Sequence, residues 1–183
     1  MLKSSSRKGE LVPIVTDLAP PPTGSPFRYV GLDRDNTLIE DAGYSKLDKE
    51  PSWLPSVIEG LKLFHSADLG LVIFTNQAAL SKGVFNLFQL EDFHMRMNLS
   101  LINQTGFGFN GIIICPHLQD QGCSCRKPRP GMFHAAQKIY GELPQVMIGD
   151  SDTDIQAAES AGVFAVKTNQ EDFLQVSSEW LDG

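Results

Sequence analysis

The sequence predicts an α/β fold: a three-layer, Rossmann-like parallel sheet with helices on both faces. Short apolar runs rich in β-branched residues alternate along the chain with stretches whose apolar residues recur at helical spacing. Strands that alternate with helices form parallel sheets through crossover connections, and these place helices on both faces. The chain has 183 residues, of which 42% are hydrophobic and 20% charged, so its size and composition suit one globular domain.

Five apolar runs have the length and composition of strands that are covered on both faces. In chain order they are residues 29–32, 69–74, 112–114, 146–148 and 163–166. Each of the first four precedes a polar or reactive residue: Asp33, Thr75, Cys115 and, after one glycine, Asp150. Ligands bind such sheets beyond the carboxyl ends of the strands, so we expect these four residues to lie at one edge of the sheet.

The stretches between these runs have the pattern of amphipathic helices. The apolar faces are Val57, Leu61 and Phe64; Leu90, Phe93, Met97 and Leu101; Phe133, Ala136 and Tyr140; and Ile155, Ala158 and Ala161. Pro55 stands near the start of the first helix. Gly141 and Gly162 follow the last two faces, where glycine C-caps are expected.

The two ends of the chain have weaker patterns. Residues 1–26 are predicted to be an extended, flexible tail, because the run Pro20-Pro21-Pro22 removes amide donors and disfavours helix. Residues 11–15 are apolar enough to pack on the body. Residues 172–183 are expected to form a short closing helix or a frayed end. The domain is therefore predicted to span residues 27–183.

The charge balance argues against two classes of partner. The chain has 22 acidic and 15 basic side chains and a net charge of -7, so it repels nucleic-acid phosphates and anionic lipid. No apolar run approaches the about 20 residues that span a bilayer. The N-terminus has no signal-peptide pattern. We expect a cytoplasmic monomer that binds neither nucleic acid nor membranes.

Two clusters of carboxylates follow two different strand-like runs. Asp33 and Asp35 come after the first run, and Asp150, Asp152 and Asp154 come after the fourth. Each cluster alone could be a turn or a helix N-cap, because Asp favours both. That interpretation does not explain why two clusters stand at one sheet edge. Converging carboxylates repel each other unless a cation intervenes, and oxygen ligands favour Mg²⁺.

Thr75-Asn76-Gln77 and Arg126-Lys127 supply the complementary groups. A hydroxyl followed by amide donors suits an oxyanion, and the two cations belong to a chain that is short of them. Alone, each segment is equally compatible with a polar loop or a solvated basic pair. Together with the carboxylates they predict a phosphate site, with Thr75 and Lys127 opposite the metal.

The three cysteines fall in one short segment with a histidine. Cys115, His117, Cys123 and Cys125 offer three sulfurs and one imidazole, which is a usual tetrahedral ligand set for Zn²⁺. Their spacing departs from common zinc-finger spacings, and three idle buried cysteines are the alternative. Four protein ligands leave no open position, so the predicted zinc is structural. It would staple the loop that precedes Arg126 and Lys127.

These motifs occur in the order found in one phosphatase family. Asp33-Arg34-Asp35-Asn36-Thr37, Thr75, Lys127 and Gly149-Asp150-x-x-x-Asp154 resemble the four motifs of the haloacid dehalogenase-like phosphatases, over residues 28–168. Gly43-Tyr44 and residues 82–85 and 126–132 resemble the D-glycero-D-manno-heptose 1,7-bisphosphate 7-phosphatases. The five-residue spacing between His117 and Cys123 resembles the related histidinol-phosphate phosphatases.

The sequence departs from the family pattern at two places. Asn36 stands where the family usually has glycine, and asparagine tolerates the left-handed backbone that such a turn needs. Ala78-Ala79 replaces the family's Ser-Gly, which removes a hydroxyl near the substrate. This second departure bears on which sugar is bound.

The resemblance implies a Mg²⁺-dependent phosphomonoesterase that acts on a small sugar phosphate through an aspartyl-phosphate. The heptose bisphosphate is preferred over histidinol phosphate, because three flanking features outweigh one loop length. Asp33 would be the nucleophile, and Asp35 would act first as general acid and then as general base. Mg²⁺ would be held by Asp33, the backbone carbonyl of Asp35 and Asp150. Thr75 and Lys127 would bind the phosphoryl oxygens.

The remaining roles follow from the same resemblance. Asp154, or alternatively Asp152, would support the metal or orient Lys127. Asn76 and Arg126 would contact the substrate. The segments after the first two motifs are short, so no large cap domain is expected over the site.

Three other functions share parts of this pattern. Asn36 and Ala78-Ala79 would suit a non-catalytic, zinc-containing interaction module of the same fold, but all the groups needed for chemistry are present. A nucleic-acid 3′-phosphatase shares the Asp-x-Asp core, and the net charge of -7 argues against it. A phosphomutase shares the aspartyl-phosphate, and the absence of a cap argues against that.

Overall fold

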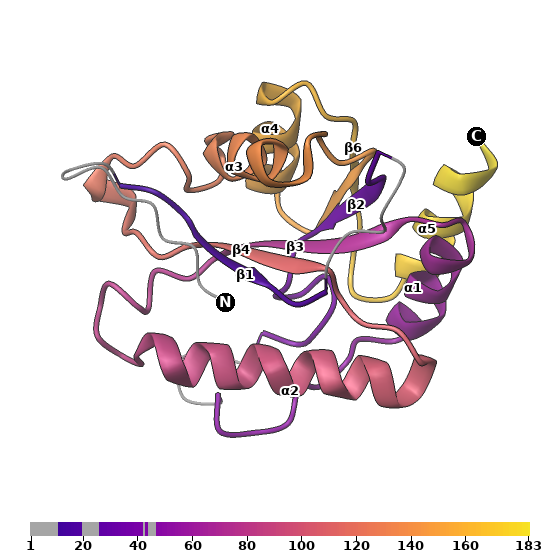
Figure 1. Ribbon diagram of the computed structural model, residues 1–183, viewed down its shortest axis with the longest axis horizontal. Coiled ribbons are helices and arrows are strands. Elements are labelled where there is room, and N and C mark those ends of the chain that lie inside the picture. The colour runs from indigo at the N-terminus through magenta and orange to yellow at the C-terminus, as the bar shows by residue number, and fades with distance from the viewer. Residues whose placement is uncertain (1–10, 20–25, 42, 44–46) are drawn as a thin grey trace.

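Six strands form one mixed sheet at the centre of the molecule (Figure 1). The structure is a computed structural model and describes residues 11–19, 26–41, 43 and 47–183. The strand order is β1-β4-β3-β2-β5-β6. The strands are β1 (Ile14–Asp17), β2 (Tyr29–Leu32), β3 (Gly70–Asn76), β4 (Gly111–Cys115), β5 (Met147–Gly149) and β6 (Ala165–Lys167). The pairs from β4 to β6 are parallel, which confirms the predicted parallel core of the sheet.

Helices cover both faces of the sheet, which gives the predicted three layers. On one face pack α1 (Val57–Ser66), α2 (Leu87–Thr105) and α5 (Phe173–Asp182), and on the other α3 (Gly131–Tyr140) and α4 (Asp152–Ser160). In Figure 1, α2 runs below the sheet while α3 and α4 lie above it. Of the two alternatives for the C-terminal segment, the structure shows the helix, and it packs against α1.

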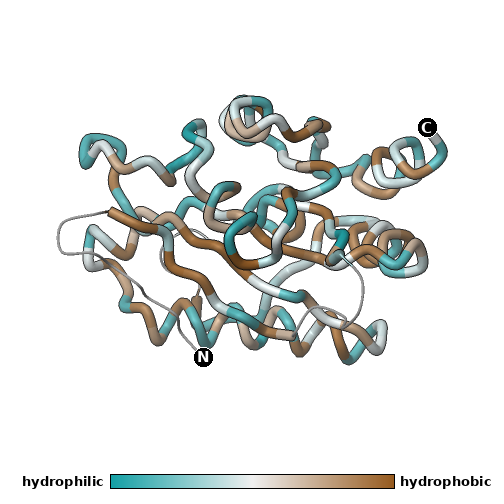
Figure 2. The backbone as a smooth tube through the Cα atoms, turned by 45° about the horizontal axis from the view of Figure 1, so that its top comes forward, coloured by the Kyte–Doolittle hydropathy of each residue, from teal (hydrophilic) through white to brown (hydrophobic). Residues whose placement is uncertain are grey.

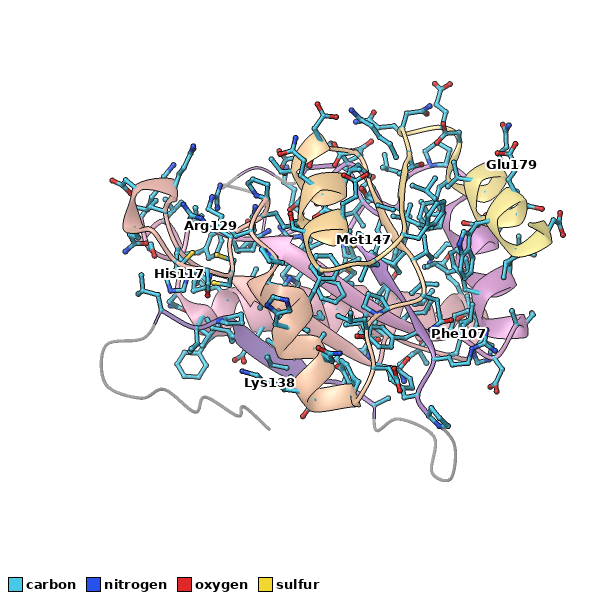
Figure 3. The ribbon with its side chains drawn as sticks, turned by 90° about the horizontal axis from the view of Figure 1, so that it is seen from above. Phe107, His117, Arg129, Lys138, Met147 and Glu179 are labelled. Atoms are coloured by element: carbon cyan, nitrogen blue, oxygen red, sulfur yellow. The ribbon has the colours of Figure 1, made fainter. Side chains whose placement is uncertain are left out.

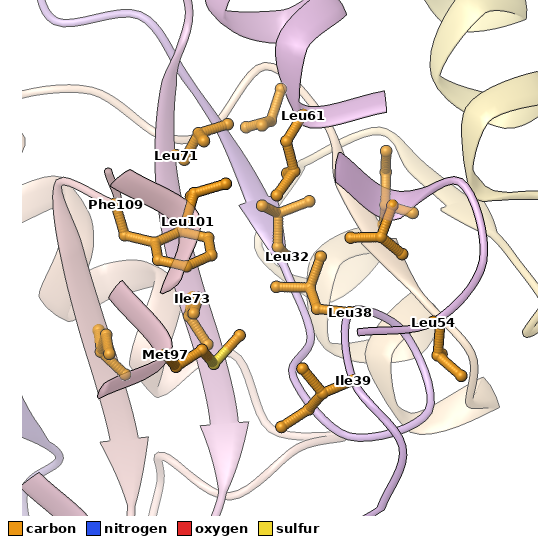
Figure 4. Close-up of a cluster of buried hydrophobic side chains, with 14 of the residues drawn as sticks. Leu32, Leu38, Ile39, Leu54, Leu61, Leu71, Ile73, Met97, Leu101 and Phe109 are labelled. Atoms are coloured by element: carbon orange, nitrogen blue, oxygen red, sulfur yellow. The ribbon is translucent and has the colours of Figure 1, made fainter. Parts of the chain in front are cut away.

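The inner strands are buried on both faces because their alternate side chains enter two separate cores. In β3, Leu71 and Ile73 join the core under α1 and α2, while Val72 and Phe74 join the core under α3 and α4. The hydrophobic segments accordingly run along the sheet in Figure 2, and Figure 3 looks onto the α3 and α4 face. Figure 4 shows the first core, where Leu32 and Ile73 meet Leu101 of α2.

Strand β1 corrects the expectation that residues 1–26 lie outside the domain. Ile14–Asp17 pairs antiparallel with β4, in the register Val15 to Ile113, and Val15 is buried. This apolar segment completes the open hydrogen-bonding edge of β4, a gain that the nearby prolines obscure in the sequence. Residues 1–10 and 20–25 of the predicted tail, and Tyr44 of the Gly43-Tyr44 motif, lie outside the described residues.

The last strand begins later than the predicted run 163–166. The amide of Val163 donates to the carbonyl of Ala158 and closes the end of α4, and the side chain of Phe164 is 63% exposed. The residue register with β5 begins at Ala165, although the carbonyl of Phe164 already accepts from the amide of Met147 at 2.9 Å. An apolar run can therefore include the end of a preceding helix turn, which its composition does not reveal.

The topology brings two strand ends to a switch point. From β2 the chain proceeds through β3 to β4 on one side, and then crosses to β5 on the other side of β2. Asp33 follows β2 and Asp150 follows β5, so they meet where the strand order reverses. Within the part of the chain that the structure describes, no helix is inserted between β2 and α1 or between β3 and α2. None of the described helices is long and apolar enough to cross a membrane.

Candidate active site

A tight turn after β2 sets the direction of the first pair of carboxylates. The amide of Asp33 donates to the carbonyl of Ile148 at 2.9 Å, which continues the β2–β5 ladder by one residue. Asn36 then adopts a positive φ of 59°, and its amide donates to the carbonyl of Ile39. The left-handed turn expected at Asn36 is thus confirmed. Asp33 and Asp35 contact different partners: Asp33 contacts Lys127, and Asp35 contacts Arg34 and Gln77.

Lys127 is the centre of the site and is buried, with 4% exposure. Its Nζ donates to Asp33 Oδ1 at 2.6 Å and to the carbonyl of Phe74 at 2.8 Å, and it forms an ion pair with Asp154. Burial alone would lower the pKa of Lys127, but the charges of Asp33 and Asp154 raise it above its usual value. Lys127 is therefore a permanent cation held in one position.

Three carboxylates surround this ammonium group. Asp33, Asp150 and Asp154 offer oxygens that all lie within 4.8 Å of one another. Burial raises the pKa of Asp33; Lys127 opposes this, and the charges of Asp154 and Asp35 add to it. Burial and Asp154 also raise the pKa of Asp150. One ammonium does not balance three carboxylates, so this all-oxygen donor set suits a hard divalent cation such as Mg²⁺.

The structure distinguishes the two acids that the sequence left open as supporting residues. Asp154 is buried, pairs with Lys127, and accepts hydrogen bonds from the amide and hydroxyl of Ser151 at 3.1 and 2.5 Å. Asp152 instead points to solvent and pairs with Lys167 at 2.5 Å. Of the two, only Asp154 lies in the carboxylate cluster.

Asp35 is held by donors on two sides. Arg34 donates to both of its carboxylate oxygens, at 2.9 to 3.0 Å. Gln77 Nε2 donates to Asp35 Oδ2 at 2.9 Å and to Thr75 Oγ1 at 2.8 Å. Gln77 thus connects the end of β3 with the turn after β2. The sequence singled out Thr75, Asn76 and Gln77 as a segment but did not indicate which carboxylate Gln77 contacts.

Asn76, predicted to contact substrate, holds the Lys127 backbone. Its side-chain amide donates to the Lys127 carbonyl and accepts from the Lys127 amide, both at 3.2 Å. Asn76 also lines the catalytic pocket, a hollow of about 150 Å³ that includes Asp33, Asp35, Thr75 and Lys127. Asn76 thereby fixes the position of the Lys127 backbone beside that pocket.

A second hollow of about 300 Å³ adjoins the first and shares Asn76, Lys127 and Thr153 with it. Its other lining residues include Arg126 and Arg129. Arg126 Nη1 donates to the carbonyl of His117 at 3.2 Å, and Arg129 Nη1 donates to that of Cys123 at 2.5 Å. These contacts anchor both guanidinium groups beside the catalytic pocket and give the second hollow a cationic wall.

The cysteine segment folds into a compact cluster, with His117 and Arg129 beside the sulfur atoms (Figure 3). Cys115 Sγ lies 3.7 Å from Cys123 Sγ and 3.4 Å from Cys125 Sγ, and His117 Nδ1 lies 3.2 Å from Cys125 Sγ. A tetrahedral ion with Zn–S bonds of about 2.3 Å requires sulfurs about 3.8 Å apart. The hydrogen bond from Cys125 lowers the pKa of Cys115 to about 5 and raises the pKa of Cys125, so the two sulfurs share a proton and one of them is a thiolate. All four predicted ligands are therefore together, in an arrangement that suits zinc.

Two residues of the site were missed by the sequence analysis. Arg34 stands inside the first motif, but no role was indicated for it. No role in the site was predicted for His94, which is buried and whose Nε2 lies 2.9 Å from Arg34 Nη1. The signal for Arg34 is a cation placed between two carboxylates, whereas no local pattern connects His94 of α2 to it.

The chain is similar to known proteins over most of its length. A family model described as HAD-hydrolase-like matches residues 124–172. The chain is 37% identical over 139 residues to the D-glycero-beta-D-manno-heptose-1,7-bisphosphate 7-phosphatase of Bordetella bronchiseptica, covering 74% of the chain and 77% of that protein. It is 34% identical over 148 residues to the histidine biosynthesis bifunctional protein HisB of Blochmanniella floridana, covering 76% of the chain and 40% of that protein.

A solved structure is also similar to this chain. The D,D-heptose 1,7-bisphosphate phosphatase of B. bronchiseptica, crystallised with magnesium and phosphate, superposes with a TM-score of 0.71 at 30% identity. The match covers 83% of this chain and 86% of that one.

Proposed function

The chain belongs to the haloacid dehalogenase-like phosphatases, in the group that contains the D-glycero-β-D-manno-heptose-1,7-bisphosphate 7-phosphatases, and we propose that it removes the 7-phosphate of a heptose 1,7-bisphosphate. One observation carries the choice of substrate. The catalytic pocket around Lys127 adjoins a hollow walled by Arg126 and Arg129. A site for the reacting phosphate beside a cationic site for a second phosphate matches a sugar bisphosphate.

The first half of the reaction transfers the phosphoryl group to Asp33. A carboxylate oxygen of Asp33 forms a bond to phosphorus as the bond from phosphorus to the sugar oxygen breaks. Asp35 gives its proton to that departing oxygen, which leaves as an alcohol. Thr75 and Lys127 hold the non-bridging oxygens, and their fixed positions stabilise the charge of the transition state.

The second half releases phosphate and restores the enzyme. Asp35, now ionised, takes a proton from a water molecule, and the resulting nucleophile attacks phosphorus. The bond between phosphorus and Asp33 breaks, and inorganic phosphate leaves. Gln77 bonds both Asp35 and Thr75, so it keeps the acid–base group and the phosphate-binding hydroxyl at a constant spacing.

A divalent cation at the carboxylate cluster completes the site. Asp33 and Asp150 would hold Mg²⁺ with the backbone carbonyl of Asp35, while Asp154 positions Lys127. When bound, Mg²⁺ neutralises the negative charge of the phosphate and makes it open to attack by a carboxylate.

The cysteine cluster would hold a structural Zn²⁺. Cys115, His117, Cys123 and Cys125 supply all four ligands, so no position is left for substrate. Metal analysis of the purified chain by mass spectrometry tests this assignment, with one zinc per chain expected. A wild-type protein that folds without zinc would refute it.

Histidinol phosphate is the second candidate substrate, because the short His117–Cys123 spacing and the HisB relative both favour it. The two candidates differ in charge beyond the reacting phosphate. Histidinol phosphate carries a protonated amine there, which Arg126 and Arg129 would repel, whereas the bisphosphate carries an anion.

Phosphate release from the two substrates, measured side by side with Mg²⁺, tests the proposal. A higher kcat/KM for the bisphosphate, lost in Asp33→Asn, is the expected result. Arg126→Ala should raise KM for the bisphosphate and leave p-nitrophenyl phosphate, which has a single phosphate, unaffected. A preference for histidinol phosphate would replace the substrate, and activity on neither would refute the proposed function.

A further inference from the structure

The side chain of Arg34 is buried, with 3% exposure, although it belongs to the turn that carries the catalytic acids. Its Nε and Nη2 both donate to Asp35 Oδ1, at 3.0 and 2.9 Å, and Nη2 also donates to Asp35 Oδ2 at 2.9 Å. A planar guanidinium that contacts both oxygens fixes the plane of the carboxyl group, which a lysine ammonium cannot do.

Arg34 is in turn held by His94 of α2. Arg34 Nη1 lies 2.9 Å from His94 Nε2, and the histidine is buried, with 1% exposure. Arginine has only donors, so Nε2 must be the acceptor, and the proton of the imidazole must sit on Nδ1. Burial, and secondly the charge of Arg34, lower the pKa of His94 well below 6.5, which keeps it in this neutral form.

Phe93, the residue before His94, provides a third contact for the Arg34 guanidinium. The guanidinium carbon of Arg34 lies 5.4 Å from the ring centroid of Phe93, within the range of a cation–π contact. Phe93 is buried in the core under α2. The guanidinium therefore has an aromatic face, a nitrogen acceptor and a carboxylate as partners, and α2 supplies two of the three.

We propose that Arg34, seated by Phe93 and His94, is a positioning residue for the general acid Asp35, so that α2 controls protonation of the leaving group. Asp35 lines the catalytic pocket while it is bound to Arg34, so its carboxyl group is oriented by a contact outside the substrate's reach. The inference rests on the proposed phosphatase reaction and adds to it a second layer of residues that contact no substrate.

Leaving-group dependence tests this role. The value of kcat/KM reports only steps up to departure of the alcohol, where Asp35 acts as acid. An alkoxide needs the proton, whereas p-nitrophenolate departs without it. General acid assistance contributes about 10²–10⁴-fold. Arg34→Lys is therefore expected to lower kcat/KM for the heptose bisphosphate by about tenfold or more, and to change that for p-nitrophenyl phosphate by less than about threefold.

Two further variants separate positioning from folding. His94→Gln keeps an acceptor for Arg34 and should retain most of the wild-type ratio of the two kcat/KM values, whereas His94→Leu removes the acceptor and should lower it. Arg96→Lys is the matched control, since Arg96 also lies over Phe93, at 5.6 Å, but pairs with Asp92 and Glu50. It should leave the ratio unchanged.

The outcomes distinguish this inference from the proposed function. Equal losses for both esters in Arg34→Lys, or a higher kcat/KM for the sugar ester, would overturn the positioning role and leave the phosphatase standing. If the wild type cleaves p-nitrophenyl phosphate and not the bisphosphate, histidinol phosphate takes its place as the alkyl ester. Wild-type activity on none of the three would refute both.

Discussion

Replacing Gly149 with alanine is expected to displace the residue that orients Lys127. A Cβ at position 149 would lie 2.6 Å from Cβ, Cγ and Oδ2 of Asp154, whereas ordinary contact begins at 3.4 Å. The difference, 3.4 minus 2.6, requires Asp154 to move by about 0.8 Å. The hydrogen bond from the Ser151 amide, now 3.1 Å, could lengthen to about 3.9 Å, beyond hydrogen-bond range.

The size of the effect follows from these contacts. Overpacking a close-packed site costs about 1–3 kcal/mol, and losing a hydrogen bond to a charged group costs about 1.5–3 kcal/mol. One movement of Asp154 relieves the first cost by incurring the second, so the two are not added in full. We expect a loss of about 2–4 kcal/mol in the free energy of unfolding. Displacement of Lys127 with Asp154 should lower kcat by about 10²-fold.

Urea unfolding and steady-state phosphate release measure the two quantities. Gly31→Ala is the matched control, because a Cβ there would meet Met147 Sδ and Phe74 Cε2 at 3.1 Å, side chains that can yield by a few tenths of an ångström. It should cost less stability and leave kcat unchanged. If Gly149→Ala were as stable and as active as Gly31→Ala, the close packing of Gly149 against Asp154 would not hold Lys127.

Three further changes have defined outcomes. Burial depresses the pKa of His94 below 6.5 in the folded state, so the unfolded chain binds one more proton and stability falls as the pH drops below 6.5. His94→Gln lacks this proton. Between pH 7.5 and 5.5 the variant should therefore lose about 1.4 kcal/mol less stability than the wild type, as measured by urea unfolding. Cys123→Ala should release zinc and lower the unfolding temperature, whereas unchanged zinc content would exclude Cys123 as a ligand. Asp154→Asn should lower kcat by at least tenfold while Asp152→Asn should not, and equal effects would contradict the placement of Asp154 at Lys127.

The sequence predicts those parts of the site that local patterns encode. Asp33 and Thr75 each follow a buried apolar run, and strand ends of a parallel sheet meet at one edge, so their proximity follows from the pattern alone. The position of Asp154 does not follow from the pattern, because Asp152 and Asp154 differ only in which side of the first turn of α4 they occupy. The pairing of Arg34 with His94 joins residues 60 positions apart through tertiary packing, which no short motif records.

The cysteine cluster is connected to the pocket around Lys127 through hydrogen bonds to the backbone of its own loop. The amide of Gln77 donates to the carbonyl of Cys115 at 2.7 Å, so the residue that holds Asp35 and Thr75 is attached to the first cysteine of the cluster. On the other side of the cluster, Lys127 follows Cys125 by two residues, and Asn76 bonds its amide and carbonyl. Gly131 packs against the backbone of Ser124 and Cys125 so closely that a Cβ would lie 2.5 Å from the Ser124 carbonyl oxygen. A loop fixed at these points carries Lys127 to Asp33 with little freedom, because every attachment holds the backbone of the loop rather than a mobile side chain of it. The cluster therefore constrains the position of Lys127 beside Asp33, although its own four side chains are buried away from that pocket.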